Sequence, residues 1–178
     1  MVFNKIGYFL YDIAILTRVW MESTLINFSS NNDISKINDN IYIGNLSTST
    51  NKKLLLENGI THIICIMSQP TSYFPKDFKY LNIHAYDIPE FDLTYTFPVS
   101  NTFIDNAVKE NGKIYIHCMC GASRSVSIVL SYFLWKYPNI SLEEHLSNIV
   151  DKRDKANPNS GFLKQLQEFN KINYEKIE

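Results

Sequence analysis

The sequence predicts an α/β fold with a central, mainly parallel, twisted sheet of about four to five strands flanked by helices. Short apolar segments rich in β-branched residues alternate with longer segments whose apolar residues recur at helical spacing. This alternation is typical of parallel sheets covered by helices on both faces. The length of 178 residues fits one compact domain, and 45% hydrophobic with 20% charged residues is ordinary for a chain that folds by itself.

Four segments have the composition of strands. They are residues 41–43, 60–67, 80–86 and 113–117. The second is an apolar, β-branched run that suits a strand buried on both faces. The third shows the alternation of a half-buried strand.

Five segments are predicted as helices. They are residues 50–58, 97–110, 124–136, 141–153 and 160–173. Asn58-Gly59 and Asn111-Gly112 are stop signals for the first two. The stretch from Ser141 to Glu144 is a capping box that opens the fourth.

The amino-terminal part of the chain predicts an extra helix, because apolar residues recur at helical spacing over residues 4–22. We expect residues 1–36 to form this N-terminal helix and a linker, and residues 37–174 to form the main domain. Asp12 and Arg18 interrupt the apolar run before it reaches the roughly 20 residues of a membrane span. No membrane span or secretory signal is therefore expected. Both helix faces are apolar, so a homodimer through this helix competes with simple packing.

The charge balance and the cysteines restrict the function classes. The formal net charge is -1, so no nucleic-acid partner is expected and any phosphate recognition must be local. The three cysteines, Cys65, Cys118 and Cys120, provide neither a disulfide framework nor the ligands of a structural zinc site. A reducing, cytoplasmic setting fits best, with the nucleus still open.

The most informative stretch is Ile114–Ser125, which reads as a buried strand, a tight loop and a helix start. Successive backbone N–H groups in such a loop form an anion-binding nest, and the helix end adds its positive dipole. Gly121 supplies the backbone freedom that the turn requires. The candidate phosphate-binding residues are Met119, Cys120, Gly121, Ala122, Ser123 and Arg124.

A thiol at the mouth of this nest is expected to ionise easily and act as a nucleophile, which assigns that role to Cys118. Arg124 can grip two phosphate oxygens with a planar fork that Lys lacks. The alternatives are a buried structural cysteine or a metal site from His117, Cys118 and Cys120. Such a metal site lacks a fourth ligand, and we expect no metal and no cofactor.

The pattern His117-Cys118-x-x-Gly121-x-x-Arg124-Ser125 resembles the signature of the protein tyrosine phosphatase superfamily, and of the dual-specificity phosphatases in particular. The resemblance covers roughly residues 38 to 170 and implies a cysteine-dependent protein phosphatase with the dual-specificity fold. Other segments resemble family landmarks in the same order. These are Asn40–Asn45, Gly59–His62, Asp87–Leu93, Arg153, Asn157–Leu163 and Gln165-Leu166. Cys120 is a departure, because the family often has Ala there.

The resemblance implies a two-step mechanism in which Cys118 attacks phosphorus and water then cleaves the phosphocysteine. Asp87 matches the position of the family's loop acid, which protonates the leaving oxygen and later acts as a base. Glu90 and Asp92 share its loop, and Asp92 is the weaker candidate for the same role.

Three further side chains receive supporting roles. Ser125 is expected to hydrogen-bond the sulfur, to cap the helix, or both. His117 is expected to order the loop by hydrogen bonding. Cys65 and Cys120 are candidates to trap oxidised Cys118 as a disulfide, with Cys65 favoured, although either could be a buried structural thiol.

The loop side chains indicate the substrate class. Positions Met119, Cys120, Ala122 and Ser123 carry no charge, whereas a phosphoinositide would favour Lys or Arg there. A phosphorylated protein is therefore the expected substrate, with phosphotyrosine, phosphoserine and phosphothreonine all open. The alternatives are a phosphatase of RNA 5′ ends or phosphoinositides, and a catalytically weak module that binds phosphoproteins.

Overall fold

The structure, a computed structural model, describes residues 33–174. The predicted N-terminal helix lies outside the described residues. Within residues 33–174, no helix is both long and apolar enough to cross a bilayer.

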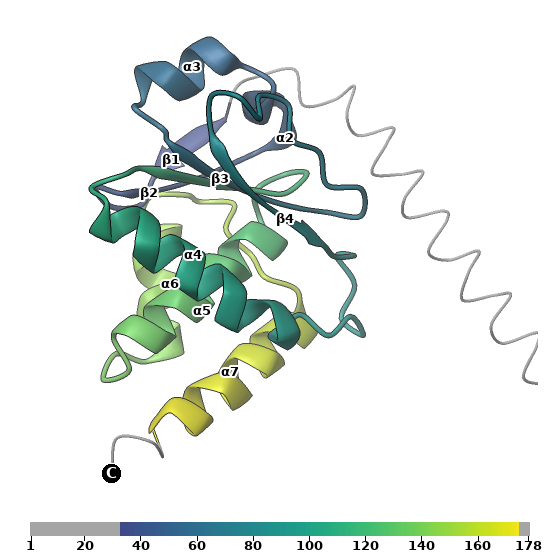
Figure 1. The fold of residues 1–178 in the computed structure, drawn as a ribbon. Helices are drawn as coiled ribbons and strands as arrows, with labels where there is room; N and C mark the ends of the chain where they lie inside the picture. Colours follow the sequence, from purple (N-terminus) through teal and green to yellow (C-terminus); the bar gives the residue numbers. More distant parts are fainter. Residues whose placement is uncertain (1–32, 175–178) are drawn as a thin grey trace, which may run out of the picture.

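A five-stranded sheet with the order β1-β2-β5-β3-β4 forms the centre of the molecule (Figure 1). Its strands are β1 (Ile34–Lys36), β2 (Ile41–Gly44), β3 (His62–Met67), β4 (Lys79–His84) and β5 (Ile114–His117). All neighbours pair in parallel except β1, which runs antiparallel to β2 at one edge. The predicted mainly parallel α/β fold is confirmed.

Two strand predictions need correction. β1 lies in a segment that was predicted as a linker, because its three residues are too few to show a strand pattern. It is a strand because it pairs with β2. β4 ends at His84 instead of residue 86. Within residues 33–174 it is an edge strand that pairs with β3 alone, and the last pair of that ladder is Met67–His84.

The helices include the five predicted segments in their order and two short additional elements. They are α2 (Leu46–Ser49), α3 (Lys52–Glu57), the 3-10 turn η1 (Thr94–Thr96), α4 (Phe97–Lys109), α5 (Arg124–Lys136), α6 (Leu142–Val150) and α7 (Ser160–Tyr174). α3 lies within the predicted helix 50–58 and begins where the Asn51 side chain caps it by accepting from Leu54 N, whereas the short α2 before it was not predicted. α6 ends at Val150, three residues before the prediction.

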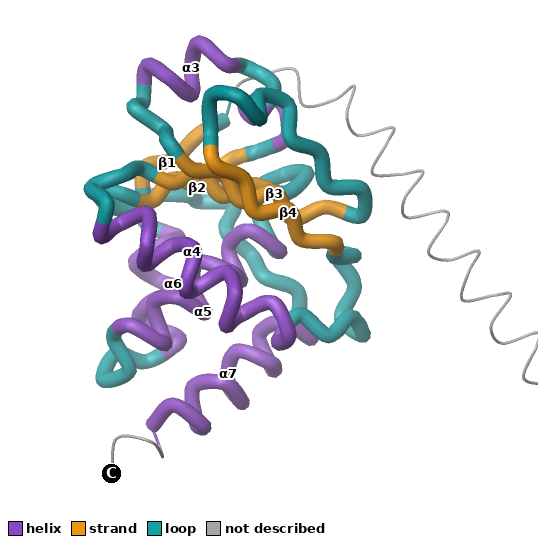
Figure 2. The backbone as a smooth tube through the Cα atoms, in the orientation of Figure 1, coloured by secondary structure: helices purple, strands orange, loops and turns teal. Residues whose placement is uncertain are grey.

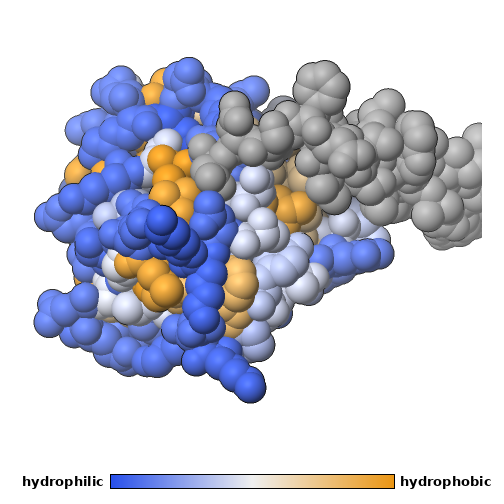
Figure 3. Space-filling view, turned by 90° about the horizontal axis from the view of Figure 1, so that it is seen from above, coloured by the Kyte–Doolittle hydropathy of each residue, from blue (hydrophilic) through white to orange (hydrophobic). Residues whose placement is uncertain are grey.

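The helices cover the two faces of the sheet unequally. Helices α4 to α7 lie on one face, and the short α2 and α3 lie on the other (Figures 1 and 2). Every residue of α5 from Arg124 to Leu134 is buried, because the sheet, α4, α6 and α7 all contact this helix. The outer surface seen from the α3 side is mostly hydrophilic, with small separate apolar patches (Figure 3).

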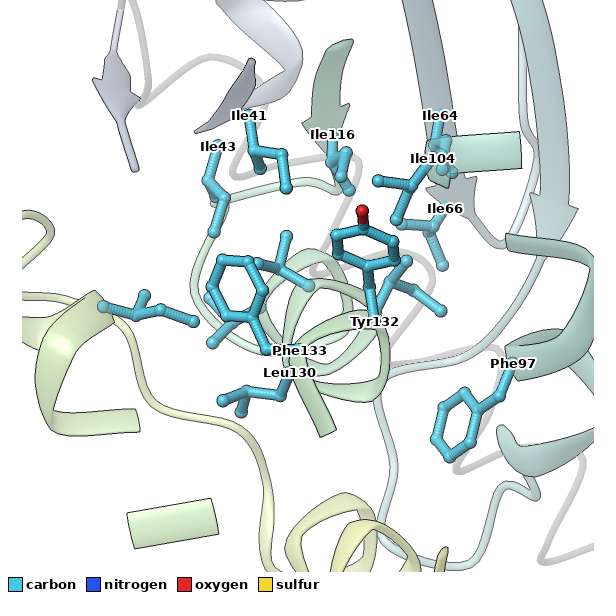
Figure 4. Packing of buried hydrophobic residues seen from close by; sticks show 14 of the residues in the cluster. Ile41, Ile43, Ile64, Ile66, Phe97, Ile104, Ile116, Leu130, Tyr132 and Phe133 are labelled. Atoms are coloured by element: carbon cyan, nitrogen blue, oxygen red, sulfur yellow. The ribbon is translucent and has the colours of Figure 1, made fainter. Parts of the chain in front are cut away.

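The main core lies between the sheet and α5. Tyr132 and Phe133 of α5 point toward isoleucines of the sheet, among them Ile43 and Ile116 (Figure 4). Residues of the opposite parity, such as Tyr42, pack on the other face with Leu55 of α3. The alternation of side chains along each strand therefore fills two separate cores.

The carboxyl ends of the parallel strands meet at one edge of the sheet. Gly44 pairs with His117, and His117 pairs with Cys65, so β2 and β5 end side by side next to β3, which continues to Met67. Ligand sites in open α/β sheets lie at this edge. The fold thus brings the Cys118 segment and the chain after β4 to the same place.

Leu130 and Leu56 provide a matched test of the core. Leu130 of α5 is fully buried, whereas Leu56 of α3 is 51% exposed. We expect Leu130→Ala to lower the free energy of unfolding by about 2–5 kcal/mol, since it removes buried methyl groups and leaves a cavity. Leu56→Ala should change it by less than about 0.5 kcal/mol. Urea denaturation of both variants measures the difference, and equal losses would contradict this assignment of the core.

Candidate active site

The loop between β5 and α5, residues 118–124, is called the cysteine loop below. Each backbone carbonyl from Cys118 to Ser123 accepts a hydrogen bond from a donor on the outer side of the loop. The donors in chain order are His117 Nδ1, Leu46 N, Arg153 Nη2, Arg153 Nε, Asn157 N and Ser127 N. Because C=O and N–H point in opposite directions across a planar peptide, the following N–H groups turn to the inner side. The loop is therefore an anion-binding nest.

Gly121 makes the sharp turn of this loop possible. Its φ is +68°, a conformation that other residues rarely adopt. A Cβ at this position would also collide with the Gly44 carbonyl and with the Arg153 guanidinium. Both the conformation and the space require glycine here.

The Cys118 thiol lies at the mouth of the nest and is 1% exposed. Its Sγ accepts from Gly121 N at 3.2 Å and lies 3.4 Å from Ser125 Oγ. Burial opposes ionisation, but the charge of Arg124 and the hydrogen bonds from Ser125 outweigh it, so the pKa of Cys118 is lowered. A lowered pKa favours the thiolate, which is the nucleophilic form of cysteine.

Asp87 reaches the cysteine loop from the segment that follows β4. Its Oδ1 accepts from Ser123 Oγ at 2.7 Å, and its Oδ2 lies 3.5 Å from Arg124 Nε. Arg124 is 2% exposed and donates from Nη1 to Ala85 O at 3.2 Å. The structure thus brings a carboxyl group, a guanidinium group and a thiol together.

The other two carboxylates of that segment lie elsewhere. Asp92 Oδ1 accepts from both the backbone N and the hydroxyl of Thr94, at 2.9 and 2.6 Å, so it caps the turn that starts η1. Glu90 is exposed to solvent. Neither has a hydrogen bond to the cysteine loop among the contacts of the described residues.

His117 is completely buried and stacks on Tyr115, with ring centroids 5.5 Å apart. Burial, assisted by the charge of Arg124, lowers the pKa of His117 to about 4, so the ring is neutral near pH 7. Its Nδ1 lies 3.3 Å from the Cys118 carbonyl, which can only accept, so Nδ1 carries the proton. A neutral, donating ring orders the loop.

Arg153 has a structural role that was not predicted from the sequence, where it was only one of the positions that resemble the phosphatase family. The side chain is 1% exposed and donates to the carbonyls of Cys120 and Gly121. Asp33 neutralises it with a two-oxygen contact at 3.1 and 2.8 Å. The scarcity of arginine was the available signal, because a planar fork can hold neighbouring carbonyls as Lys cannot.

The three cysteines have different surroundings. Cys65 packs in one buried cluster with Cys118, and burial raises the pKa of Cys65 to about 11. Cys120 is exposed, and the pKa of its thiol is also raised, chiefly by desolvation. Among residues 33–174, no group of three or more His, Cys, Asp or Glu side chains could hold a metal ion.

A low-pKa cysteine in an amide nest, beside a buried arginine and a carboxyl group, defines a cysteine-dependent phosphatase. The dual specificity phosphatase catalytic domain family matches residues 41–172, and the chain belongs to this family. It is accordingly a cysteine-dependent protein phosphatase.

The chain is similar to dual specificity protein phosphatase 1B of Arabidopsis thaliana, with 35% identity over 139 residues that cover 78% of this chain and 83% of the relative. It is also similar to dual specificity protein phosphatase 1 of the same plant, with 33% identity covering 81% and 72%. The solved structure of DUSP15 has 32% identity and a TM-score of 0.77, and the match covers 83% of this chain and 93% of that one. The relatives and the solved structure agree with the family match that this is a dual-specificity phosphatase domain.

Removal of the Ser125 hydroxyl should raise the pKa of Cys118, because that group stabilises the thiolate. We expect the pH midpoint for alkylation of Cys118 by iodoacetate to move upward in Ser125→Ala, as measured by peptide mass mapping. Ser147→Ala, a change at an exposed position of α6, serves as the control and should leave the midpoint unchanged. An unshifted midpoint in Ser125→Ala would show that the hydroxyl does not stabilise the thiolate.

The disulfide between Cys65 and Cys118 stays a prediction. Peroxide should convert the Cys118 thiolate to sulfenic acid, which condenses with the Cys65 thiol and releases water. A thiol reductant should then restore activity, whereas Cys65→Ser should progress to sulfinic acid and stay inactive. Mass mapping that finds only sulfinic acid in the wild type refutes the idea, and persistence of the disulfide in Cys65→Ser would identify Cys120 as the partner.

Proposed function

We propose that this chain hydrolyses phosphate esters of tyrosine, serine and threonine in proteins, with Cys118 as the nucleophile. The cysteine loop carries the proposal, because its outward-anchored carbonyls direct successive N–H groups toward the space beside the thiol. A phosphate dianion would accept hydrogen bonds from these N–H groups through its oxygens. Arg124 supplies a fixed positive charge at the same place.

In the first step, the Cys118 thiolate attacks phosphorus and the bond to the leaving oxygen breaks. Asp87 protonates that oxygen, because it is the carboxyl group hydrogen-bonded to the cysteine loop. Arg124 and the loop amides hold the equatorial oxygens, whose charge must be stabilised during transfer. The product is a phosphocysteine and a free hydroxyl side chain.

In the second step, water attacks the phosphocysteine and the thiolate leaves. Asp87, now ionised, accepts the proton from the attacking water, which reverses its earlier role. Ser125 Oγ, 3.4 Å from the sulfur, stabilises the thiolate as it departs. Orthophosphate then leaves the nest and restores the starting state.

A phosphoprotein is the substrate class that the loop favours. Met119, Cys120, Ala122 and Ser123 add no cation to the nest, whereas a phosphoinositide or a polyphosphate end calls for additional basic groups. The names of the Arabidopsis relatives, both dual specificity protein phosphatases, point the same way. The combination of Cys118, Arg124 and Asp87 favours turnover over a binding module.

The cellular setting follows from the same chemistry. A nucleophilic thiolate must stay reduced, so we place the protein in a reducing compartment such as the cytoplasm. A homodimer through the N-terminal helix stays a prediction, because that segment lies outside the described residues.

Substitution of the proposed nucleophile and acid tests the function. Cys118→Ser should abolish hydrolysis of an aryl phosphate, since the hydroxyl is not ionised. Asp87→Ala should lower kcat by roughly 10²–10⁴-fold and retain bound phosphopeptides, because proton transfer contributes about that factor. Steady-state kinetics and capture of phosphopeptides measure both effects.

Asp154→Ala is the matched control for the acid, because Asp154 is exposed and should leave kcat unchanged. Turnover by Cys118→Ser at the wild-type rate would rule out the phosphocysteine route. A wild type that binds phosphopeptides without turnover would identify a binding module instead.

A further inference from the structure

The loop that carries Asp87, residues 87–93, is called the aspartate loop below. The start of α7 holds it at three separate points. Asn159 Nδ2 donates to Asp87 Oδ1 at 2.9 Å. Gln165 accepts from Leu93 N and donates to Phe91 O, each at 2.8 Å.

The third point is the contact of Gly161 with Pro89. A Cβ on Gly161 would collide with the backbone of Pro89, so helix and loop are in direct backbone contact there. These contacts span both ends and the middle of the aspartate loop. The loop is therefore seated on α7 over its full length.

Asn159 joins the two loops of the site to this helix. Its Oδ1 caps α7 by accepting from Phe162 N at 3.0 Å. Its backbone N donates to Ser123 Oγ at 3.1 Å, and that hydroxyl in turn donates to Asp87 Oδ1. One residue thus contacts the carboxyl group, the serine that bonds the carboxyl group, and the helix itself.

We propose that Asn159 is a positioning residue for Asp87, and that the start of α7 presets the aspartate loop for proton transfer. This inference rests on the proposed role of Asp87 as the general acid. The Asn159 amide and the Ser123 hydroxyl both donate to Oδ1. These two hydrogen bonds fix the orientation of the carboxyl group and leave Oδ2, the oxygen 3.5 Å from Arg124 Nε, turned toward the phosphate-binding group.

The dependence of rate on the leaving group tests the proposal. An effective acid makes the rate nearly independent of the acidity of the leaving phenol, because the oxygen departs protonated. The test uses a series of aryl phosphates that ends at phosphotyrosine, whose phenol has a pKa of about 10. For wild type, a plot of the logarithm of kcat/KM against the pKa of the leaving phenol should have a shallow slope. Asn159→Ala should show a steeper slope and lose about tenfold in kcat/KM for phosphotyrosine, a smaller loss than removal of the acid.

Two further variants separate positioning from helix stability. Asn159→Ser keeps an N-cap side chain but is too short to hold Asp87, so it should match Asn159→Ala in slope while retaining more of the wild-type Tm. Gly161→Ala improves helix propensity but pushes against Pro89, so its slope should also steepen. Asn106→Ala, at an exposed position of α4, is the control and should leave the slope unchanged.

A double-mutant cycle with Asp87→Asn decides the mechanism. Once the acid is absent, Asn159→Ala should cause no further loss, because the two residues act through one carboxyl group. A uniform loss across the series, or an equal loss with and without Asp87, overturns the positioning role. A wild-type slope in Asp87→Asn overturns the acid assignment itself, so the two failures are distinguishable.

Discussion

The site depends on the outward anchoring of the cysteine loop. Aligned N–H groups repel one another, and a loop without external donors would turn some peptides over to relieve that repulsion. Arg153 prevents this because its buried fork holds the carbonyls of Cys120 and Gly121, and Asp33 balances the charge that burial would otherwise make costly. Asp33 has a lowered pKa, because its hydrogen bonds to Arg153 and Lys155 outweigh the effect of burial, so it stays ionised at neutral pH.

The other site residues are positioned by this loop and by the strand and helix on either side of it. β5 is buried and pairs on both sides, and α5 is covered by the sheet and three helices, so the two ends of the loop are fixed. Cys118 lies at the first of these ends and Arg124 at the second. Asp87 contacts the loop between them by accepting from Ser123 Oγ, and Asn159 at the start of α7 donates to the same carboxyl oxygen. The proposed nucleophile, phosphate clamp and acid are thus held by parts of one core.

The strand, loop and helix from 114 to 136 could be predicted because their signals are local: an apolar run, a loop that contains a glycine, and a second apolar run. The same holds for α6, whose capping serine lies beside the helix it starts. β1 could not be predicted, because three residues carry no pattern and their strand character comes from pairing with β2. The contacts of Asn159 were equally hidden. Its partner Asp87 lies 72 residues away, and an asparagine in a polar segment carries no periodic signal.

The contact between Asp33 and Arg153 joins residues 120 positions apart, at opposite ends of the domain. Arg153 follows Cys118 and Arg124 in the sequence, so the cysteine loop does not itself contain the arginine that shapes it. Asn157 and the start of α7 also come later. The proposed nucleophile therefore has its full set of neighbours only when segments from both ends of the domain have packed against the cysteine loop.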